Sequence, residues 1–334
     1  MWIPLLSPQR EPEPHTPTSM QALLNAIATM ALPTDAQRIF HGRGGQYPGC
    51  EQWALDWFAP VWLLTSFKPV DPVDLAQIQK ALEARWSTIA PADTPLNWVF
   101  QYRDGERTQT QLMAGSVPEP HDVTECGARY RLHLLKGQNH GLFLDMAAGR
   151  QWVREQAAHV KDAKVLNLFA YTCAFSIAAL QGGAKQVVNV DMSAGAIGLG
   201  QVNHAINGFS AGASFLPHDI FKSWGKITRS GPYHLVIVDP PSFQKGSFVA
   251  TKDYAKLMRR LPDLLRPGGR AVLCLNAPEL SAGFLQTLMA ETAPELVFEQ
   301  RLENPPAFAD VYPERALKVL IYCAPNLPPR AAPT

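Results

Sequence analysis

Four acidic or amide residues in the second half of the chain each close a short segment rich in aliphatic or aromatic residues. They are Asp191, Asp219, Asp239 and Asn276. If these segments are parallel strands, their carboxyl ends meet at one edge of a sheet, which is where ligands bind in open α/β folds. The four side chains are therefore candidates for a single binding and catalytic site.

Asp191 lies 19 residues after Thr172, which stands in a short turn that follows another apolar segment. An acid at about this spacing is suited to bind the two hydroxyl groups of a ribose. Alternatively it caps the helix expected at 193–206, and the two roles are compatible. Asp219 is suited to bind the amino group of an adenine, with Ile220 packed on the ring. The alternative for Asp219 is a cap of the next helix.

The turn before Thr172 contains no glycine motif for a phosphate. A dinucleotide pyrophosphate requires close approach of the backbone, typically through GxGxxG. The cluster of Gly42, Gly44 and Gly45 lies far away near the N-terminus, with Tyr47 in place of a third spaced glycine. The sequence therefore disfavours nicotinamide and flavin cofactors. It favours an adenosine cofactor without phosphates, namely S-adenosylmethionine.

Strands and helices must alternate to bring these residues together. Apolar strands are expected at 165–171, 187–191, 214–219, 234–239 and 270–276, with helices at 174–181, 194–206, 221–227 and 253–265. A helix at 283–292 and strands at 296–301 and 317–322 follow. Apolar strands between amphipathic helices are typical of a parallel sheet covered on both faces. The predicted fold is α/β, with a doubly wound, mostly parallel, seven-stranded Rossmann-like sheet.

The first part of the chain has a different organisation. Residues 1–35 form a proline-rich arm and a helix at 20–30 that Ser19 could cap, and residues 36–125 form a smaller α/β domain. In that domain we expect a strand at 61–67, a helix at 74–86 and a strand pair at 97–102 and 108–113. The large domain covers 126–324, beginning with strands at 130–135 and 141–145 and a helix at 150–160. Residues 325–334 form a tail.

Composition limits the classes of function. The 334 residues include 46% hydrophobic and 18% charged residues, which excludes a disordered or fibrous protein. The formal net charge is +1, but residues 1–130 carry −5 and the remainder +6, so a polyanion is expected to contact the second half. Five scattered cysteines indicate neither a metal site nor a disulfide framework. We expect no membrane span or signal peptide and a cytoplasmic protein, and the oligomeric state stays open.

Several motifs together resemble a known family. The runs GLFLD, VLNLFAYTCAF, GGAKQVVNVDMS, NHAINGF, YHLVIVDPPSF and LLRPGG are similar to those of class I methyltransferases. More narrowly, they resemble the bacterial large-subunit (23S) ribosomal RNA methyltransferase family with cytosine-5 and guanine-N7 members. The resemblance is strong over 130–324 and weaker over 45–122. Family members begin with a small RNA-binding (PUA-type) domain, whereas only the arm and helix at 1–35 precede the similar region here.

The resemblance implies a role for each matching position. S-adenosylmethionine would be bound by Phe169, Tyr171 and Thr172 around methionine and ribose, Asp191 and Met192 around ribose and adenine, and Asp219 and Ile220 at the adenine edge. The catalytic positions beside the methyl group and the incoming base would be Asp239, Pro240, Pro241 and Asn276, with Asp239 also touching the cofactor. The substrate would be bound by Phe243, stacked on a flipped base, and by Asp145 and Arg150, which match the lead-in acid and its last arginine.

Two departures from the family pattern bear on the chemistry. Cytosine-5 members carry a cysteine where this chain has Asn276, because a ring carbon must first be attacked by a nucleophile. A base nitrogen attacks the methyl group directly, and guanine-N7 members have asparagine there. We expect Cys274, two residues earlier, to be a core residue. Cys173 stands in the cofactor turn where the family has glycine, and we expect it to narrow that turn as a small buried thiol.

These observations predict a methyltransferase that acts on a base nitrogen of ribosomal RNA. His41 and Arg43 in the glycine-containing FHGRGG segment could reach a phosphate of that RNA. The basic residues after DPPSF are a second source of contacts, or alternatively a solvated helix face: Lys245, Lys252, Lys256, Arg259 and Arg260. Methylation of a protein or small molecule on the same fold stays open. So does a non-catalytic protein that binds S-adenosylmethionine.

Overall fold

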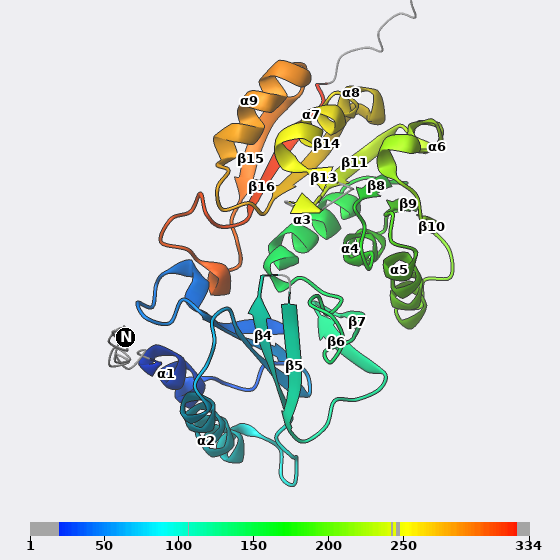
Figure 1. Cartoon of the computed structure of the whole chain (residues 1–334). Helices are drawn as coiled ribbons and strands as arrows, with labels where there is room; N and C mark the ends of the chain where they lie inside the picture. Colours follow the sequence, from blue (N-terminus) through cyan, green and yellow to red (C-terminus); the bar gives the residue numbers. More distant parts are fainter. Residues whose placement is uncertain (1–19, 106, 242, 245–247, 326–334) are drawn as a thin grey trace, which may run out of the picture.

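The computed structural model describes residues 20–105, 107–241, 243–244 and 248–325. It contains two large sheets, a five-stranded one in the first half of the chain and a seven-stranded one in the second half (Figure 1). Ser19, proposed above as a helix cap, lies outside the described residues. No helix in the described parts of the chain is long and apolar enough to cross a membrane.

The seven-stranded sheet has the predicted α/β architecture. Its order is β10-β9-β8-β11-β14-β16-β15, and the first five of these strands run parallel while β16 runs antiparallel to both neighbours. The strands are β8 Lys164–Leu168, β9 Gln186–Val190, β10 Ala213–Leu216, β11 Tyr233–Val238, β14 Leu265–Leu275, β15 Val297–Leu302 and β16 Lys318–Cys323. The strand order reverses between β8 and β11, which is the place where doubly wound sheets bind ligands.

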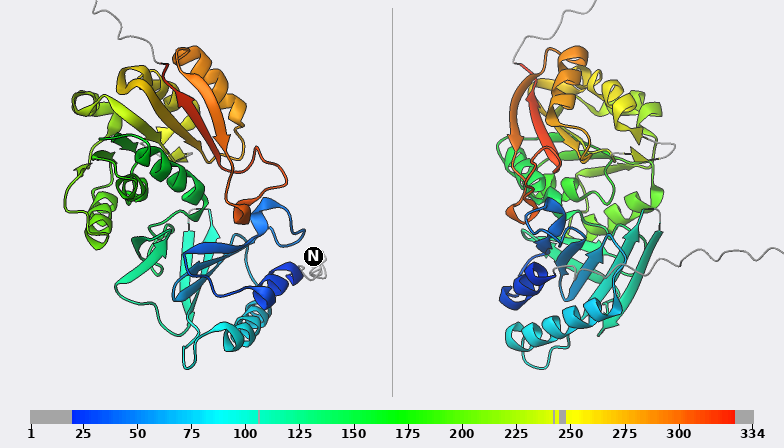
Figure 2. Two further views of the ribbon diagram at one scale, coloured as in Figure 1. Left: turned by 180° about the vertical axis from the view of Figure 1, so that it is seen from behind. Right: turned by 60° about the vertical axis from the view of Figure 1, so that its left-hand side comes forward.

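Helices cover both faces of this sheet (Figures 1 and 2). They are α3 Ala147–Ala158, α4 Ala174–Gln181, α5 Ala194–Ile206, α6 Trp224–Ser230, α7 Ala250–Met258, α8 Leu261–Leu264 and α9 Ala282–Thr292, with short 3-10 turns η2 Leu144–Met146, η3 Ile220–Lys222 and η4 Pro306–Phe308. One apolar cluster joins the sheet to α6–α9 and another joins it to α3 and α4. The central strands are buried on both faces, which explains why their sequences are continuously apolar.

The five-stranded sheet has the order β1-β2-β3-β4-β5, with only β3 and β4 parallel. Its elements are α1 Gln21–Thr29, β1 Gln37–His41, η1 Gly42–Gly44, β2 Trp53–Phe58, β3 Val61–Ser66, α2 Pro72–Ile89, β4 Trp98–Asp104 and β5 Arg107–Ala114. Asp71 caps α2, and Pro72 occupies its first turn, where a missing N–H costs nothing. Helices α1 and α2 pack on one face of the sheet over a cluster rich in tryptophan.

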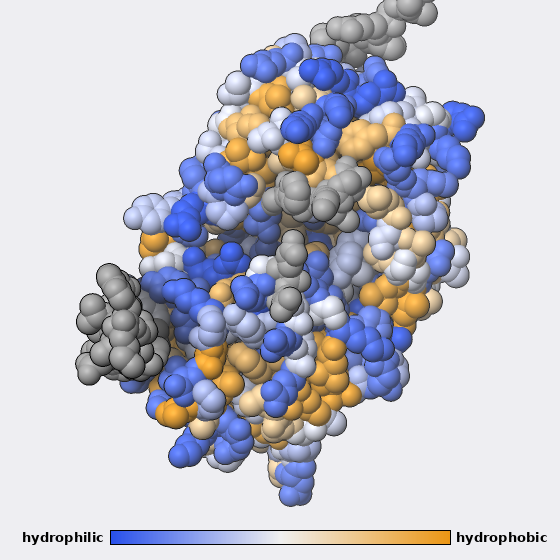
Figure 3. All heavy atoms as spheres, viewed as in Figure 1, coloured by the Kyte–Doolittle hydropathy of each residue, from blue (hydrophilic) through white to orange (hydrophobic). Residues whose placement is uncertain are grey.

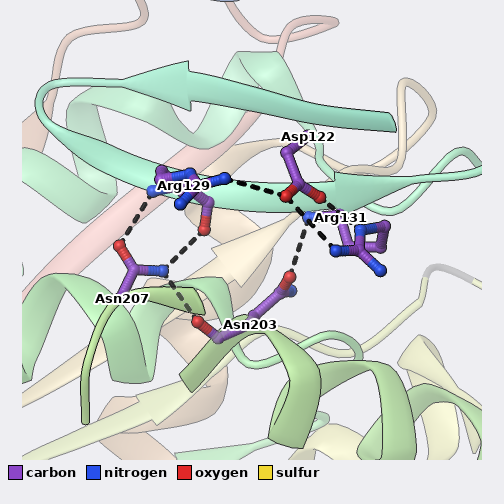
Figure 4. Close-up of polar contacts among 5 residues, drawn as sticks. All are labelled: Asp122, Arg129, Arg131, Asn203 and Asn207. Atoms are coloured by element: carbon purple, nitrogen blue, oxygen red, sulfur yellow. Dashed lines mark hydrogen bonds and ion pairs between the residues drawn. The ribbon is translucent and has the colours of Figure 1, made fainter. Parts of the chain in front are cut away.

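The opposite face of the small sheet packs toward the large one. A continuous apolar cluster runs from Phe58 and Leu63 of the small sheet to Ile177 of α4. The hairpin of β6 (His121–Glu125) and β7 (Ala128–Leu132) belongs to that cluster. On α5, the side chains of Asn203 and Asn207 bind the backbone of β7 (Figure 4). The two sheets are therefore parts of one packed structure.

Several details differ from the sequence-based expectations. The segment at 141–145 is no strand: it is irregular and ends in η2. The strand expected at 165–171 ends at Leu168, because the next residues form the turn described below. The helix expected at 221–227 is the short turn η3 followed by α6. The helix expected at 253–265 is divided into α7 and α8, since Pro262 has no N–H to continue an α-helical ladder.

Candidate active site

A cavity of about 550 Å³ opens at the carboxyl ends of β8, β9, β11 and β14. It brings together most of the residues that the sequence singled out: Asp145, Arg150, Phe169, Tyr171, Thr172, Asp191, Met192, Asp219, Ile220, Asp239, Pro240, Pro241 and Asn276. Phe243 lies in the short strand β12 (Phe243–Gln244), paired with β13 (Phe248–Val249). The structure does not describe the side chain of Phe243. Lys245 lies outside the described residues.

The turn after β8 forms the floor of this cavity. Phe169, Tyr171 and Cys173 all have positive φ angles, at 56°, 45° and 62°. Such angles are costly for residues with a Cβ, so surrounding contacts must hold the turn. The Thr172 hydroxyl donates to the carbonyl of Gly141 at 2.6 Å, and the Tyr171 amide donates to Asp191. The turn thus presents its backbone to the cavity in one fixed conformation.

Asp191 is anchored at the end of β9 by two backbone amides. Its Oδ2 accepts from the Tyr171 N–H and its Oδ1 from the Ser193 N–H, both at 2.8 Å. The cap of α5 is Ser193, whose hydroxyl accepts from Ala196. Asp191 is therefore not the helix cap considered above. Its carboxylate lies at the cavity wall with its orientation set by the cofactor turn.

Asp219 does serve as a cap, as the alternative interpretation held. Its Oδ1 accepts from the Phe221 N–H at 2.9 Å at the start of η3, and Oδ2 lies 3.4 Å from Lys222 Nζ. Ile220 is buried beside it and also lines the cavity. Capping fixes the carboxylate at the cavity edge, so capping does not exclude contact with a ligand.

Cys173 is a small buried thiol, as expected. The residue is fully buried and is not among those that line the cavity. Its side chain points toward Gly200 of α5, where an added Cβ would come within 2.5 Å of the sulfur. Burial raises the pKa of the Cys173 thiol, so the group stays protonated. A glycine on α5 thus makes room for the side chain that replaces a glycine in the turn.

Asp239 at the end of β11 shares a desolvated region with a second acid. Burial raises its pKa to about 7, and the neighbouring Asp145 carboxyl acts in the same direction. Arg150 and a hydrogen bond with the Cys274 side chain oppose the rise. Asp239 is therefore balanced between its protonated and ionised forms near neutral pH.

Cys274 lies in the core, as expected, but it also touches the site. It is fully buried, and burial raises the pKa of its thiol well above the ordinary value. The protonated thiol can donate to the Asp239 carboxylate. The hydroxyl of Tyr254 donates to the backbone carbonyl of the same cysteine. The sequence shows that Cys274 lies two residues before Asn276. Its contact with Asp239, which follows the neighbouring strand, depends on the register of β11 against β14 and could not be predicted.

Arg150 is held by an ion pair with Glu125 of the β6–β7 hairpin. Its Nε and Nη2 donate to the two carboxylate oxygens at 2.7 and 2.6 Å, and both side chains are nearly fully buried. This is a bidentate arrangement that fixes the guanidinium plane. Arg150 also lines the first cavity, so its charge acts on Asp239 and Asp145 from a fixed position. No feature of the sequence indicated the pairing with Glu125.

A second cavity of about 280 Å³ adjoins the first, between the two sheets. The two cavities share five lining residues: Asn139, Phe143, Asp145, Asn276 and Leu317. Arg43 lies in the second cavity, on the side of the small sheet. In Figure 3 a hollow bordered by hydrophilic residues is visible between the two parts of the molecule. The candidate site is therefore elongated, with Asn276 and Asp145 where its two ends meet.

The glycines around Arg43 have a structural explanation. An added Cβ on Gly42 would lie 1.8 Å from the carbonyl oxygen of Cys50, and one on Gly44 would lie 2.1 Å from that of Ala309. The backbone thus approaches other parts of the same chain rather than open solvent. This packing sets Arg43 at the cavity, stacked over the Phe67 ring with its guanidinium carbon 4.3 Å from the ring centre.

Sequence reasoning missed several lining residues. Phe143 is exposed and its ring centre lies 5.4 Å from that of Tyr171. Phe67, Arg103 and Arg315 line the second cavity. The sequence offered no periodic signal for them, because they come from separate elements that meet only in the folded chain. No group of three or more His, Cys, Asp or Glu that could hold a metal ion occurs within the described residues.

Comparison with known proteins agrees with this geometry. Residues 37–323 match the family of S-adenosylmethionine-dependent methyltransferases. The chain belongs to that family. The match covers both sheets and both cavities, so the small sheet is part of the shared architecture as well.

Two relatives act on ribosomal RNA by name. The ribosomal RNA large subunit methyltransferase I of Aeromonas salmonicida is 30% identical over 197 residues, which cover 57% of this chain and 49% of that protein. The ribosomal RNA large subunit methyltransferase K/L of Shewanella loihica is 35% identical over 182 residues, covering 53% and 24%. The matched part is thus about half the length of the first relative and less of the second.

The fold is also found in a solved structure. The crystal structure of SMU.776 complexed with SAH has a TM-score of 0.74 and 24% identity, covering 91% of this chain and 78% of that one. At this level of identity the likeness concerns the fold, which it confirms as Rossmann-like with an accompanying smaller sheet.

The cofactor of the family fits the first cavity. A volume of about 550 Å³ is within the range of small-molecule sites. Asp191 offers oriented carboxylate oxygens, and buried Ile220 offers an apolar wall for a flat ring. The strained turn after β8 contributes three side chains, not a phosphate-binding glycine loop. These features suit an adenosine that carries an amino-acid tail in place of phosphate groups.

Proposed function

We propose that this chain transfers a methyl group from S-adenosylmethionine to a nitrogen atom of a base in large-subunit ribosomal RNA. The observation that carries the proposal is the junction of the two cavities at Asn276 and Asp145. One cavity suits the cofactor, and the other reaches the small sheet, where a substrate can enter. The names of the relatives indicate the class of RNA.

In this proposal the cofactor-binding residues act from three strand ends. Asp191 binds the ribose hydroxyls, and Met192 covers the adenine, whose edge faces Asp219 and Ile220. Phe169, Tyr171 and Thr172 surround the methionine part, with Asp239 at the reacting end. S-adenosylmethionine, when bound, supplies an electrophilic methyl group on a positively charged sulfur.

The substrate end of the site would position a base edge. Asn276 offers an amide that can donate and accept hydrogen bonds, and Asp239 offers a carboxylate with a pKa of about 7. Such a carboxylate can accept a proton from a base N–H, while Pro240 and Pro241 exclude water beside it. No cysteine is required, because a nitrogen lone pair attacks directly and positioning lowers most of the barrier. Cys274 with its protonated thiol is unsuited to attack a ring carbon.

We further propose that residues 36–125 form a substrate-recognition domain, that 126–324 form the methyltransferase domain, and that Arg43, Asp145, Arg150 and Phe243 contribute to binding the RNA. Within this arrangement, Arg150 acts through Asp145 and Asp239, since Glu125 already engages its guanidinium. The second cavity, between the small sheet and the catalytic edge, is the route by which the substrate domain meets the reacting base.

The test is transfer of labelled methyl groups from S-adenosylmethionine to a lysate of cells that lack this protein. The products are divided between nuclease and protease digestion, and the labelled nucleoside is then identified. We expect nuclease-sensitive label in large-subunit RNA, on a base nitrogen. A 5-methylcytosine product would contradict the direct transfer. Protease-sensitive label would contradict the RNA substrate and favour methylation of a protein.

A variant with Asn276→Ala provides the internal control for the reaction. It should bind S-adenosylmethionine as the wild type does and transfer the methyl group at least ~100-fold more slowly, because positioning of the base is lost. Asp191→Ala should instead lose cofactor affinity. Equal binding and equal turnover in both variants would show that the site is elsewhere.

A further inference from the structure

Three arginines from separate parts of the chain line the second cavity. Arg43 comes from η1, Arg103 from β4, and Arg315 from the segment between η4 and β16. The first two come from the part of the chain that contains the five-stranded sheet, and the third comes from the part that contains the seven-stranded sheet. The cavity is therefore the place where the two halves of the molecule bring cations together.

Arg43 and Arg103 face the same aromatic ring. Their guanidinium carbons lie 4.3 and 5.9 Å from the centre of Phe67. Arg103 is also held by Gln101 Oε1 at 2.5 Å and by the carbonyl of Gln138 at 2.7 Å. These contacts fix the positions of the guanidinium groups and leave their charges uncompensated, since rings and amides carry no formal charge.

Arg38 in the same cavity behaves differently. Its Nε and Nη2 donate to the two oxygens of Asp56, at 2.7 and 2.9 Å, and its Nη1 lies 2.9 Å from His41. Asp56 thus neutralises Arg38. Among the described residues, neither Arg43 nor Arg103 nor Arg315 forms an ion pair with a carboxylate.

The charges of this cluster repel one another. Burial lowers the pKa of Arg103 to about 10, with Arg38 and Arg43 acting in the same direction, although Asp56 opposes them. Desolvation also lowers the pKa of Arg43, although its side chain still reaches solvent, and Arg38 and Arg315 add to the effect. Arg43 and Arg103 nevertheless keep their charges, because arginine is not deprotonated in proteins at neutral pH. An anion placed between them would relieve the repulsion.

The other titratable groups in the cavity offset these charges only in part, through the carboxyl groups of Asp310 and Asp145. Burial and nearby arginines lower the pKa values of His41 and His140 to about 4, so both are neutral at pH 7. The Asp310 carboxylate accepts from the Tyr312 N–H at 2.7 Å. Asp145 lies at the junction with the first cavity, where burial raises its pKa.

We propose that Arg43, Arg103 and Arg315 bind a phosphodiester group of the substrate RNA next to the nucleotide that enters the active site. This inference rests on the proposed function, because the second cavity continues into the first at Asn276. Planar guanidinium groups bind phosphate oxygens through paired N–H donors. Such a contact sets the register of the RNA and carries no base sequence information.

The test uses large-subunit ribosomal RNA purified from cells that lack this protein. Arg43→Gln and Arg315→Gln change exposed side chains, and Arg103→Lys keeps the charge while removing the planar donor set. Each Gln variant should weaken RNA binding about tenfold. It should also make the slope of log affinity against log salt less steep by ~0.7 to 0.9, as expected for the loss of one phosphate contact.

The matched control is Arg229→Gln. Arg229 is exposed on α6, which leads into the amino end of β11 on the opposite edge of the sheet, and it forms no ion pair with a described residue. It should bind RNA with the wild-type affinity and salt slope. All variants should bind S-adenosylmethionine as the wild type does, because the cluster lies outside the cofactor cavity.

A measurement without RNA separates this inference from the proposed function. Tripolyphosphate should raise the melting temperature of the wild type and of Arg229→Gln, through binding to the folded state, but not that of a variant with Arg43→Gln and Arg315→Gln. If the wild type methylates RNA while the arginine variants bind RNA unchanged, the phosphate site is wrong and the function stands. If the label enters protein instead, the RNA function fails, and a loss of binding to an acidic protein in these variants would overturn the assignment of the cluster to RNA.

Discussion

The carboxyl groups of Asp239 and Asp145 share one desolvated part of the active site. Burial raises the pKa of both carboxyl groups. Asp145 further raises the pKa of Asp239, and Arg150 opposes the rise at both. For Asp239 the result is a pKa of about 7. Its ionised form is thus populated above this pH and scarce below it, where a cationic ligand would lose an attractive charge.

This leads to a prediction for the two forms of the cofactor. S-adenosylmethionine carries a positive sulfur, and S-adenosylhomocysteine is its neutral counterpart. The ratio of their affinities should rise about tenfold in favour of the cation between pH 6 and pH 8, as Asp239 ionises (one pKa unit corresponds to about 1.4 kcal/mol). Titration calorimetry of both compounds across this range would measure the ratio.

Two substitutions control the measurement. Asp239→Asn should abolish the pH dependence of the ratio, since no carboxylate titrates beside the sulfur. Asp145→Asn should shift the midpoint to lower pH, because the neighbour that raises the pKa is removed. A ratio that stays constant in the wild type would contradict the placement of Asp239 at the reacting end.

The ionisation of Asp239 also affects stability. Its pKa in the folded chain is about 7, above the ordinary 3.8, so the folded state binds the proton more tightly than the unfolded state does. Stability from this group is present below about pH 4 and is lost progressively as the pH rises to 7. Asp239→Asn should therefore be more stable than the wild type at pH 8, with the difference shrinking toward pH 4. Urea unfolding at several pH values would measure it, and a constant difference would contradict the raised pKa.

Among individual residues, the sequence predicted the acids at the ends of the strands. It did not predict the residues that come together only when the two sheets pack. Asp191, Asp219 and Asp239 follow strands whose order is dictated by a parallel fold, so their convergence could be anticipated. Arg103 and Arg315 lie far apart in the chain, the first in β4 and the second in the segment between η4 and β16. Nothing in their local sequence marks them, because their position depends on how the sheets pack.

Among the elements, the turn after β8 and helix α5 are adjusted to each other. Cys173 has a positive φ of 62° and its sulfur lies against Gly200. Gly200→Ala would place a Cβ 2.5 Å from that sulfur, and this distance requires a shift of the turn. We expect a loss of about 1–3 kcal/mol in the free energy of unfolding, typical of overpacked sites.

A double substitution tests that interpretation. Cys173→Gly removes the sulfur and places glycine at a positive φ, so Cys173→Gly with Gly200→Ala should recover most of the stability that Gly200→Ala loses. Urea unfolding of the wild type, both single variants and the double variant gives the coupling between the two sites. Additive effects would mean that the cysteine and the glycine do not depend on each other.

Helix α5 also links the small hairpin to the turn after β8, and Figure 4 shows its contacts with the hairpin. Asn203 accepts from the Arg131 N–H at 2.8 Å and donates to the Thr172 carbonyl at 3.0 Å, whereas Asn207 binds only the backbone of Arg129 and of α5 itself. Asn203→Ala should therefore reduce both stability, by ~1–3 kcal/mol, and affinity for S-adenosylmethionine. Asn207→Ala should reduce stability to a similar extent and leave the affinity for S-adenosylmethionine unchanged. Calorimetry and urea unfolding of both variants would show whether the two losses separate.

The predicted helices and strands were wrong where the local sequence pattern does not show how a segment is hydrogen-bonded in the folded chain. The lead-in residues at 141–145 were expected as a short strand after a glycine-containing turn. They form no ladder, and the Gly141 carbonyl instead accepts from the Thr172 hydroxyl. The long helix at 253–265 was expected from its apolar spacing, which does not reveal that Pro262 begins a new turn. The central strands were placed well because burial on both faces leaves a continuous apolar signal.

Over the whole molecule, the small sheet and the catalytic edge are joined at one further place. Phe308 of η4 lies under Arg38, whose guanidinium carbon is 4.5 Å from the ring centre, and its ring centre lies 5.3 Å from that of His41. The Val311 N–H donates to the Gly44 carbonyl at 2.9 Å. The sequence indicated two α/β parts but not this contact, which depends on two loops meeting across the second cavity.

The contact at Gly44 leads to a prediction about which cavity binds RNA and which binds S-adenosylmethionine. A Cβ at this position would lie 2.1 Å from the Ala309 carbonyl, a backbone atom that cannot move aside alone, so Gly44→Ala should separate η1 from the 303–317 segment. Arg43 and Arg315 would then no longer lie at one cavity. The KM for RNA should rise about tenfold or more while the affinity for S-adenosylmethionine remains unchanged. Gly225→Ala, in open space on α6, is the matched control. If Gly44→Ala instead weakened cofactor binding and left the KM for RNA intact, the second cavity would not be the substrate end of the site.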